Sequence, residues 1–371
     1  MGIDGFRVGS VFGFEIRIDV SWFVILVLIL WSFSWGVFPA QYPDQPRAVY
    51  LAMGFAGALL FFASLLTHEL SHSLVARTKG IPVEGITLFI FGGIAHTRME
   101  AENPGDEFVI AGVGPLASLV IGLFFGAIWW VATSLGVTPA VTIVARYLAF
   151  LNVALAVFNL MPGFPLDGGR LFRSIVWRIT GDLTKATRWA TNGGKTFGLV
   201  LIALGALQLF AGAGIGGLWL IFIGWFLRNA AVMSMRQHVV RAMLEGVSAG
   251  DLMSADPAVV SPTLSLSDLV DSYFLTERHQ AFPVVDGARP VGLITLQHVK
   301  AIPRDAWPSR QVGEAMRAVD ELAVGAREPV TTALERMQDA KERRILVVDD
   351  GRLVGILSAS DVAAWVQRSQ E

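Results

Sequence analysis

The sequence contains no cysteine, so disulfide bonds and thiolate metal ligands are excluded, and any metal ion must be held by His, Asp or Glu. It is also poor in charge, because Asp, Glu, Lys and Arg make up only 16% of its residues. Ordinary soluble domains carry roughly a quarter of such residues. The formal net charge is −2, and without an excess of basic residues we expect no nucleic acid among its partners.

The missing charges are concentrated in a few long stretches. No Asp, Glu, Lys or Arg occurs in 20–43, 48–68 or 196–227, and 108–166 contains Arg146 alone. Uncharged apolar stretches of about 20 residues or more are typical of helices that cross a bilayer. The sequence therefore predicts an α-helical integral membrane protein embedded in a lipid bilayer. Its six predicted transmembrane helices lie near 20–37, 50–77, 108–135, 141–161, 197–213 and 215–231.

Basic residues beside the spans predict how the chain is oriented in a cell membrane. Six of them lie in the loop 168–195 and three more follow the last span, whereas the loop 136–140 on the opposite side carries no charge. Cytoplasmic loops are enriched in Lys and Arg, so we expect a multi-pass protein with both termini and the tail in the cytoplasm. The first span follows a charged segment and lacks a small-x-small cleavage site, which predicts an uncleaved anchor.

Two segments beside the spans have the pattern of strands. Apolar and charged residues alternate in 12–20, and 81–96 is rich in β-branched and aromatic residues with a break at Gly92-Gly93. We expect short strands at the cytoplasmic edge of the membrane, where protein or a wet cavity shields their backbone. The edge formed by 81–91 is predicted to hold an extended substrate by strand pairing.

A metal-binding pattern, His68-Glu69-Leu70-Ser71-His72, lies at the predicted end of the second span. On a helix, residues four apart share a face, so both imidazoles can reach one metal ion while Glu69 addresses a water on that ion. So short a pattern also occurs by chance on solvated helices. Here it follows twenty uncharged residues of a membrane span, where an ionisable group is costly and indicates function.

A catalytic zinc site needs a third protein ligand, and Asp167 is the candidate we favour. It lies at the end of the fourth span, where Pro162 and Pro165 interrupt the helix and two glycines follow. A carboxylate in such a break faces a cavity or a cation. His96 is the alternative, but it lies among polar residues, where a solvated histidine is the more frequent outcome.

Two asparagines precede this break on one face of the fourth span. For Asn159, one turn before the break, we expect a catalytic role in orienting the substrate or stabilising an oxyanion. For Asn152 we expect interhelical hydrogen bonding, which is common for Asn in membrane spans. Gly112, Gly114 and Ser118 in the third span are predicted to pack against neighbouring helices.

Beyond residue 241 charged residues return at ordinary density, and the tail repeats itself with a 63-residue offset, as in 283–286 and 346–349. Each copy has the pattern strand, helix, strand, strand, helix, which predicts two α/β units packed as a pair. An amphipathic connector near 233–244 joins them to the spans. The predicted domains are the membrane unit 1–231, the connector 232–246 and the two repeats 247–305 and 310–371.

Over roughly 6–231 the chain resembles the site-2 protease family of intramembrane metalloproteases. The resemblance is carried by three motifs, His68-Glu69-x-x-His72, Gly112-x-Gly114-Pro115 and Asn159-x-x-Pro162-x-x-Pro165-Leu166-Asp167-Gly168. It implies one zinc ion bound by His68, His72 and Asp167, with Glu69 as general base. It also implies a single-span membrane protein as substrate, usually trimmed first by another protease.

The two tail repeats resemble cystathionine-β-synthase (CBS) domains, which often bind adenine nucleotides such as ATP, ADP or AMP. In that family the pattern Gly-h-h-Ser/Thr-x-x-Asp supplies a hydroxyl near the phosphates and a carboxylate for the ribose. The second repeat has it intact, so the resemblance implies nucleotide contacts from Ser358 and Asp361. The first repeat keeps the hydroxyl as Thr295 but has His298 in place of the Asp. A spacer or homodimerisation module remains the alternative.

The predicted function is zinc-dependent intramembrane proteolysis, regulated by adenine nucleotide at the CBS pair. A transporter or channel gated by the tail would explain the spans and the tail equally well, yet it would not explain the metal-protease spacing of the ionisable residues. An inactive relative that only binds membrane helices is a second alternative, and zinc content would separate it.

Overall fold

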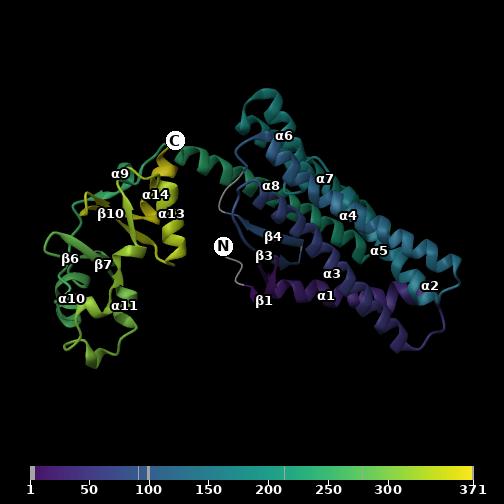
Figure 1. The fold of residues 1–371 in the computed structure, drawn as a ribbon, viewed down its shortest axis with the longest axis horizontal. Helices are drawn as coiled ribbons and strands as arrows, with labels where there is room; N and C mark the ends of the chain where they lie inside the picture. Colours follow the sequence, from purple (N-terminus) through teal and green to yellow (C-terminus); the bar gives the residue numbers. More distant parts are fainter. Residues whose placement is uncertain (1–4, 91, 98–100, 213, 278, 370–371) are drawn as a thin grey trace. The chain divides into compact units, whose positions relative to one another are not determined.

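The computed structural model describes residues 5–90, 92–97, 101–212, 214–277 and 279–369. The chain divides into two compact units, Met1–Arg236 and Gln237–Glu371 (Figure 1). The first unit contains the long helices and a small sheet, and the second contains two short-stranded α/β sheets.

Six helices among the described residues are long and apolar enough to cross a membrane, which confirms the predicted number of spans. The first begins as α1 and continues through a π-helical turn, η1, into α2. The bounds are α1 Val20–Trp31, η1 Ser32–Val37, α2 Phe38–Gln41, α3 Arg47–Thr78, α4 Pro104–Ser134, α5 Pro139–Asn159, α7 Leu183–Phe210 and α8 Ile215–Leu244. The fifth span starts well before its predicted position, and α8 runs without interruption through most of the predicted connector 232–246.

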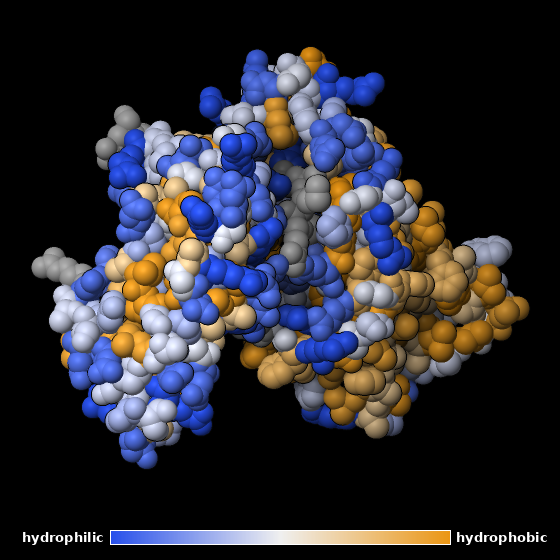
Figure 2. All heavy atoms as spheres, turned by 60° about the vertical axis from the view of Figure 1, so that its left-hand side comes forward, coloured by the Kyte–Doolittle hydropathy of each residue, from blue (hydrophilic) through white to orange (hydrophobic). Residues whose placement is uncertain are grey.

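The outer surface of these helices is apolar. Large side chains such as Phe124, Trp130, Leu135 and Phe210 are mostly exposed in the isolated chain. Figure 2 shows hydrophobic side chains gathered over the helical part of the first unit. A continuous apolar surface of this size is unfavourable in water and suits the hydrocarbon of a bilayer.

Helices α7 and α8 approach each other closely because glycines face glycines. A Cβ on Gly198 would overlap the backbone oxygen of Gly224, and one on Gly205 would overlap that of Gly217. Lipid gives no hydrophobic drive for helix association, so van der Waals contact between small residues must hold such a pair together.

A four-stranded sheet lies beside the second span. Its strands are β1 Phe6–Val11, β2 Phe14–Ile18, β3 Val83–Phe89 and β4 Gly92–Thr97. β1 and β2 form one antiparallel hairpin, β3 and β4 form another, and β2 pairs with β3 in parallel. Phe14, Ile86 and Leu88 of the sheet pack with Leu70 of α3 in one buried cluster, which places β3 and β4 alongside the metal-binding pattern.

The prediction that 81–91 forms the free edge of this sheet is wrong. Strand β3 has a partner strand on both sides, because the N-terminal strand β2 pairs with residues 85–88 on the side opposite β4. The edge on this side of the sheet is β4.

The second unit contains the two predicted repeats, and its sheets exchange their outer strands. Helices in this unit are α9 Ala249–Leu252, α10 Leu266–Leu269, α11 Leu296–Lys300, α12 Val312–Ala315, α13 Val330–Asp339 and α14 Ala359–Arg368. Strands are β5 Ser254–Ala255, β6 Ala281–Asp286, β7 Arg289–Thr295, β8 Arg317–Ala318, β9 Ala323–Gly325, β10 Arg344–Asp349 and β11 Arg352–Ser358. The sheet orders are β6-β7-β8 and β5-β11-β10-β9, so each repeat adds a short strand to the sheet of the other.

The first strand predicted for the first repeat is reduced to a single bridge between Val260 and Val284. Pro257 and Pro262 flank this segment, and proline cannot donate to a ladder. The corresponding segment of the second repeat has no proline and forms β9. Leu244, at the end of α8, is buried in the core of the second repeat.

Candidate metal centre

The metal-binding pattern lies in the last third of the long helix α3. His68 and His72 are one helical turn apart, and only 2% and 7% of their surfaces are exposed. Residues four apart lie on one face of a helix, so the two rings point in the same direction and meet at an interplanar angle of 76°. Two imidazoles are thereby held side by side within a membrane span.

Asp167 reaches the two rings from a break between helices. Helix α5 ends at Asn159, and Asp167 is the first residue of α6, Asp167–Thr180. The connecting segment is fixed by its backbone, since the Phe164 N–H donates to the Ala190 oxygen of α7 over 3.1 Å. A Cβ on Gly194 would overlap the Phe164 carbonyl, so the glycine lets the segment lie directly on α7.

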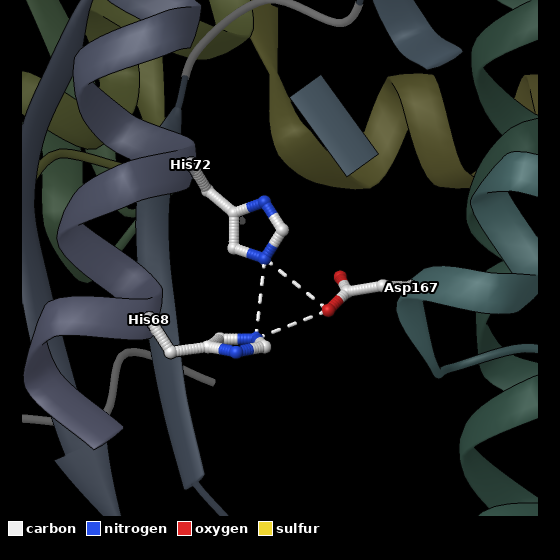
Figure 3. Close-up of side chains that lie close together, drawn as sticks. All are labelled: His68, His72 and Asp167. Atoms are coloured by element: carbon white, nitrogen blue, oxygen red, sulfur yellow. Dashed lines mark hydrogen bonds and ion pairs between the residues drawn. The ribbon is translucent and has the colours of Figure 1, made fainter. Parts of the chain in front are cut away.

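The three side chains converge on one point, as Figure 3 shows. The Oδ2 atom of Asp167 lies 3.1 Å from Nε2 of His68 and 3.2 Å from Nε2 of His72, and the two nitrogens are 3.3 Å apart. Three ligands placed tetrahedrally at about 2.0–2.1 Å from a zinc ion would be roughly 3.3 Å from one another. The donor atoms therefore have the spacing that this metal requires.

Hydrogen bonds to Nδ1 of the two imidazoles determine which ring nitrogen is free to bind a metal ion. The Nδ1 atom of His72 lies 2.6 Å from the Ile110 carbonyl oxygen, which can only accept, so Nδ1 carries a proton. In a neutral imidazole Nε2 then has the lone pair, and a proton or a metal cation must lie between it and Asp167. Nδ1 of His68 is 2.9 Å from the Ser118 hydroxyl. Such outer contacts are typical of metal-binding histidines.

Two effects act on the pKa of the Asp167 carboxyl group in opposite directions. Burial raises the pKa, and the two imidazoles beside the carboxyl group lower it more strongly, so the pKa lies below its ordinary value. A carboxylate and two imidazoles without a thiolate form an accepted catalytic zinc set that keeps one position open.

Helix α4 supplies most of the support behind the rings. Ile110 and Ser118 provide the hydrogen bonds, and between them a Cβ on Gly114 would overlap Nε2 of His72 and crowd Nε2 of His68. The sequence predicted only helix packing for Gly114 and Ser118. Their spacing of four residues on an apolar helix was the available signal that they share a face.

Glu69 and Asn159 lie at the same cavity as the cluster, which has a volume of about 750 Å³. Glu69 is half-buried, and a Cβ on Gly93 of β4 would overlap its side chain, so the strand passes directly over it. Asn159 lines the cavity from the end of α5. Asn152 instead donates to the Leu148 carbonyl over 2.9 Å and lies near Ser64 of α3, as an interhelical contact should.

His96, the alternative ligand, lies outside the cluster. Its Nε2 atom is 2.8 Å from the hydroxyl of Thr87, on the neighbouring strand β3. Among the described residues, one group of three or more potential metal ligands comes together, and it consists of His68, His72 and Asp167.

Known proteins are similar to almost the whole chain. The model of peptidase family M50 matches 56–146 and 137–204, a region that contains the entire cluster. A Mycobacterium tuberculosis protein named as a zinc metalloprotease, Rip3, is 40% identical over 375 residues, covering 98% of this chain and 93% of the relative. The chain belongs to peptidase family M50. It is a zinc metalloprotease with membrane-spanning helices, of the family that acts on membrane proteins within the bilayer.

A second relative and a solved structure are also similar to this chain. A Synechocystis protein, sll0528, also named as a zinc metalloprotease, is 35% identical over 367 residues, covering 98% of this chain and 96% of the relative. The solved site-2 protease from Methanocaldococcus jannaschii is 27% identical with a TM-score of 0.43, covering 62% of this chain and 95% of that one. The CBS domain model matches 249–303 and 312–368, so this M50 protease carries the predicted CBS pair.

The residues predicted to contact a nucleotide in the CBS pair all cap helices. Ser358 begins α14, where its hydroxyl accepts from the Asp361 N–H while the Asp361 carboxylate accepts from the Ser358 N–H. Thr295 and His298 form the same reciprocal arrangement at α11. These capping boxes explain the local spacing without any ligand.

The two capping boxes differ in the further contacts that His298 and Asp361 make. In the first repeat, Nε2 of His298 lies 2.9 Å from Oε1 of Glu342, which belongs to the second repeat. The residue that replaces the family's aspartate therefore contacts the other repeat instead of facing an open cleft. Asp361 has no such partner among the described residues.

Proposed function

We propose that the chain is an intramembrane endopeptidase that cuts transmembrane-helix substrates, with His68, His72 and Asp167 as zinc ligands and Glu69 as general base. The observation that carries this proposal is the cluster of two buried imidazoles in a membrane span with the Asp167 carboxylate, at three mutual spacings of 3.1–3.3 Å. An ion-conducting path would not require its three polar groups to share one point in space.

The roles of the ligands follow from their contacts. His72 presents the lone pair of Nε2 because its Nδ1–H donates to Ile110, and Asp167 contributes the negative charge. When bound there, zinc acts as a Lewis acid that makes a water molecule easier to deprotonate near neutral pH. A zinc ion held by these three side chains would border the cavity that Glu69 and Asn159 also line.

Glu69 accepts the proton of the water that attacks the peptide carbonyl and returns it to the leaving amine. It follows His68 directly on α3, so its carboxylate cannot share the face of the two ligands and reaches the cavity from beside them. Asn159 can donate from its side-chain amide toward the peptide oxygen as negative charge develops there.

The substrate reaches this point as an extended segment. A helical amide is shielded by its own turn, so the chain must unwind before attack. β4 is the edge strand beside Glu69, and its backbone can pair with an unwound segment and hold it over the cavity. Apolar side chains of α1, α3 and α8, including Ile25, Phe61 and Ile223, form part of the cavity wall, which suits the side chains of a membrane helix.

Glu69→Gln tests the mechanism, because it preserves the shape of the side chain and removes the base. In liposomes containing a panel of single-span membrane proteins, we expect cleavage to fall at least about 100-fold while zinc content stays at one per chain. Glu84→Gln, an exposed position on β3, is the matched control and should cleave normally. Near-normal turnover in Glu69→Gln would contradict the mechanism.

We further infer that the CBS pair binds one adenine nucleotide at the second repeat, through Ser358 and Asp361. The intact motif supports this site, as does the lack, among the described residues, of a protein partner beyond the Asp361 cap. In the first repeat Thr295 lies beside the His298–Glu342 contact. The basic residues of 168–195 and those after the last span support a cytoplasmic location for both termini and the CBS pair. Protease protection of the tail in sealed, right-side-out vesicles tests that orientation.

A further inference from the structure

A buried ion pair connects α4 with α6, one and a half turns beyond Asp167. Glu107 is completely buried and Arg173 is 7% exposed. The Nε–H of Arg173 donates to Oε1 of Glu107 over 2.7 Å, and a second guanidinium nitrogen donates to the same oxygen. The two residues are 66 positions apart in the sequence, so the pair is a tertiary contact between the two helices.

Arg173 also holds the segment that leads into Asp167. Its guanidinium lies over the ring of Phe164, 5.2 Å from the centroid. Phe164 is buried, and its N–H is hydrogen-bonded to α7. One side chain thus joins α4 to the residues immediately before the carboxylate ligand.

Glu107, the partner of Arg173, lies on the face of α4 that supports the two histidines. Glu107, Ile110, Gly114 and Ser118 follow one another at intervals of three, four and four residues, which is the spacing of one helix face. The last three contact His72 and His68. The same face of one rigid helix therefore backs the ligands from α3 and receives the helix that carries Asp167.

A gain in folding stability does not explain why the ion pair between Glu107 and Arg173 is buried. Buried ion pairs frequently add nothing to stability relative to apolar residues of similar size, because desolvation offsets the attraction. The neighbouring pair Lys79–Asp106 provides the contrast. It joins the C-cap of α3 to α4 over 2.8 Å, but both side chains are about one-third exposed, and the Asp106 carboxylate also accepts a hydrogen bond from the neighbouring Asn103.

We propose that Glu107 and Arg173 are positioning residues that set the distance of Asp167 from the two histidines. This rests on the proposed function, in which Asp167 is a zinc ligand. Removing either partner breaks the direct hydrogen bonds between α4 and α6, and Arg170, whose Nε lies 3.9 Å from the same Glu107 oxygen, is too distant to replace them. The start of α6 can then move, so the third ligand no longer lies where the two imidazoles meet.

Zinc affinity of the full-length, detergent-purified chain, measured by chelator competition, tests the proposal. We expect Glu107→Gln and Arg173→Met each to weaken zinc binding by about 10- to 100-fold, the range seen when outer contacts of a metal site are lost. Arg173→Lys keeps the charge without the forked geometry and should fall between these variants and the native chain. The cobalt-loaded single variants should show altered visible spectra, because ligand geometry has changed.

The double variant Glu107→Gln/Arg173→Met is the control for simple unfolding, since it removes both charges of the pair together. It should bind zinc no more weakly than the worse single variant, because the pair acts as a unit. Asp106→Asn, the matched control, should keep native affinity. Native affinity and spectrum in Glu107→Gln, additive losses in the double variant, or an equal loss in Asp106→Asn would each overturn the proposal. Retained zinc in Asp167→Ala would instead contradict the proposed function itself.

Discussion

The two units of the molecule place polar and apolar residues in opposite ways. In the first unit large apolar side chains cover the outside, while His68, His72, Glu107 and Asn152 are buried. In the second unit the interior is formed by aliphatic residues such as Leu266 and Ile345, with charged residues outside. A bilayer accepts the first arrangement and water accepts the second.

This difference changes what a polar motif implies. Within membrane helices a buried ionisable residue is costly, so the convergence of three such residues indicates a site. In the CBS pair the same kind of local motif has a structural role available, because Ser358 with Asp361 and Thr295 with His298 each complete a helix cap. The polar motif alone is therefore stronger support for function in the first unit than in the second.

Loss of a metal ligand in the first unit is the prediction with the largest expected effect. We expect His72→Ala or Asp167→Ala to weaken zinc binding more than about 100-fold, beyond the usual effect of an outer contact. His96→Ala should retain zinc, because that imidazole is hydrogen-bonded to Thr87 in the sheet. Metal analysis of the purified variants is the measurement, and full zinc in Asp167→Ala would reverse the assignment.

Two glycines of α4 provide a finer test of the space around the imidazoles. Gly114→Ala should lower zinc affinity by about 10- to 100-fold, because the added methyl group overlaps Nε2 of His72. Gly112→Ala is the matched control, since its Cβ would meet only Leu171, at an ordinary 3.6 Å. Equal affinities for the two variants would mean that α4 does not confine the rings.

Much of the first unit was predictable because its signals are local. Charge-free stretches predicted the six spans, and the four-residue spacing predicted that His68 and His72 share a face. The structure then brings Asp167 to the same point. Glu107 and Ser118 were not recognised as parts of the site, because their contacts join residues 50 and 66 positions apart and leave no short motif. Gly114 belongs to a motif shared with the family, but it was predicted only to pack against neighbouring helices.

Strand pairing was less predictable, because it also depends on contacts between residues far apart in the sequence. The alternation in 12–20 indicated a strand, yet it could not show that this strand pairs with β3 and moves the edge to β4. In the tail, the 63-residue repeat predicted two equivalent units. The exchange of β5 and β8 between their sheets depends on tertiary contacts that the repeat itself does not encode.

The boundary between the units can be tested through Leu244, at the end of α8. It is buried in the core of the second repeat, although it belongs to the helix of the last span. Leu244→Ala should lower the free energy of unfolding of the fragment 237–371 by about 2–3 kcal/mol. Leu275→Ala, at a position 74% exposed, should change it by less than about 0.5 kcal/mol. Urea unfolding followed by circular dichroism gives both values, and an unchanged Leu244→Ala would place the boundary after this residue.

The smallest expected effect concerns nucleotide binding by the two caps. Asp361→Asn keeps an acceptor for the Ser358 cap and removes only the charge, so it isolates the ribose contact from helix stability. Loss of one charge-assisted hydrogen bond at its lower limit of about 1.5 kcal/mol corresponds to roughly tenfold weaker binding of AMP or ATP. His298→Asn should change binding less than about twofold, because His298 already contacts Glu342 in place of the family's aspartate. Titration calorimetry of the full-length chain with each nucleotide measures both. Equal losses in the two variants would show that binding depends on the helix caps, which both repeats have. No heat with any nucleotide would leave the CBS pair as a spacer or dimerisation module.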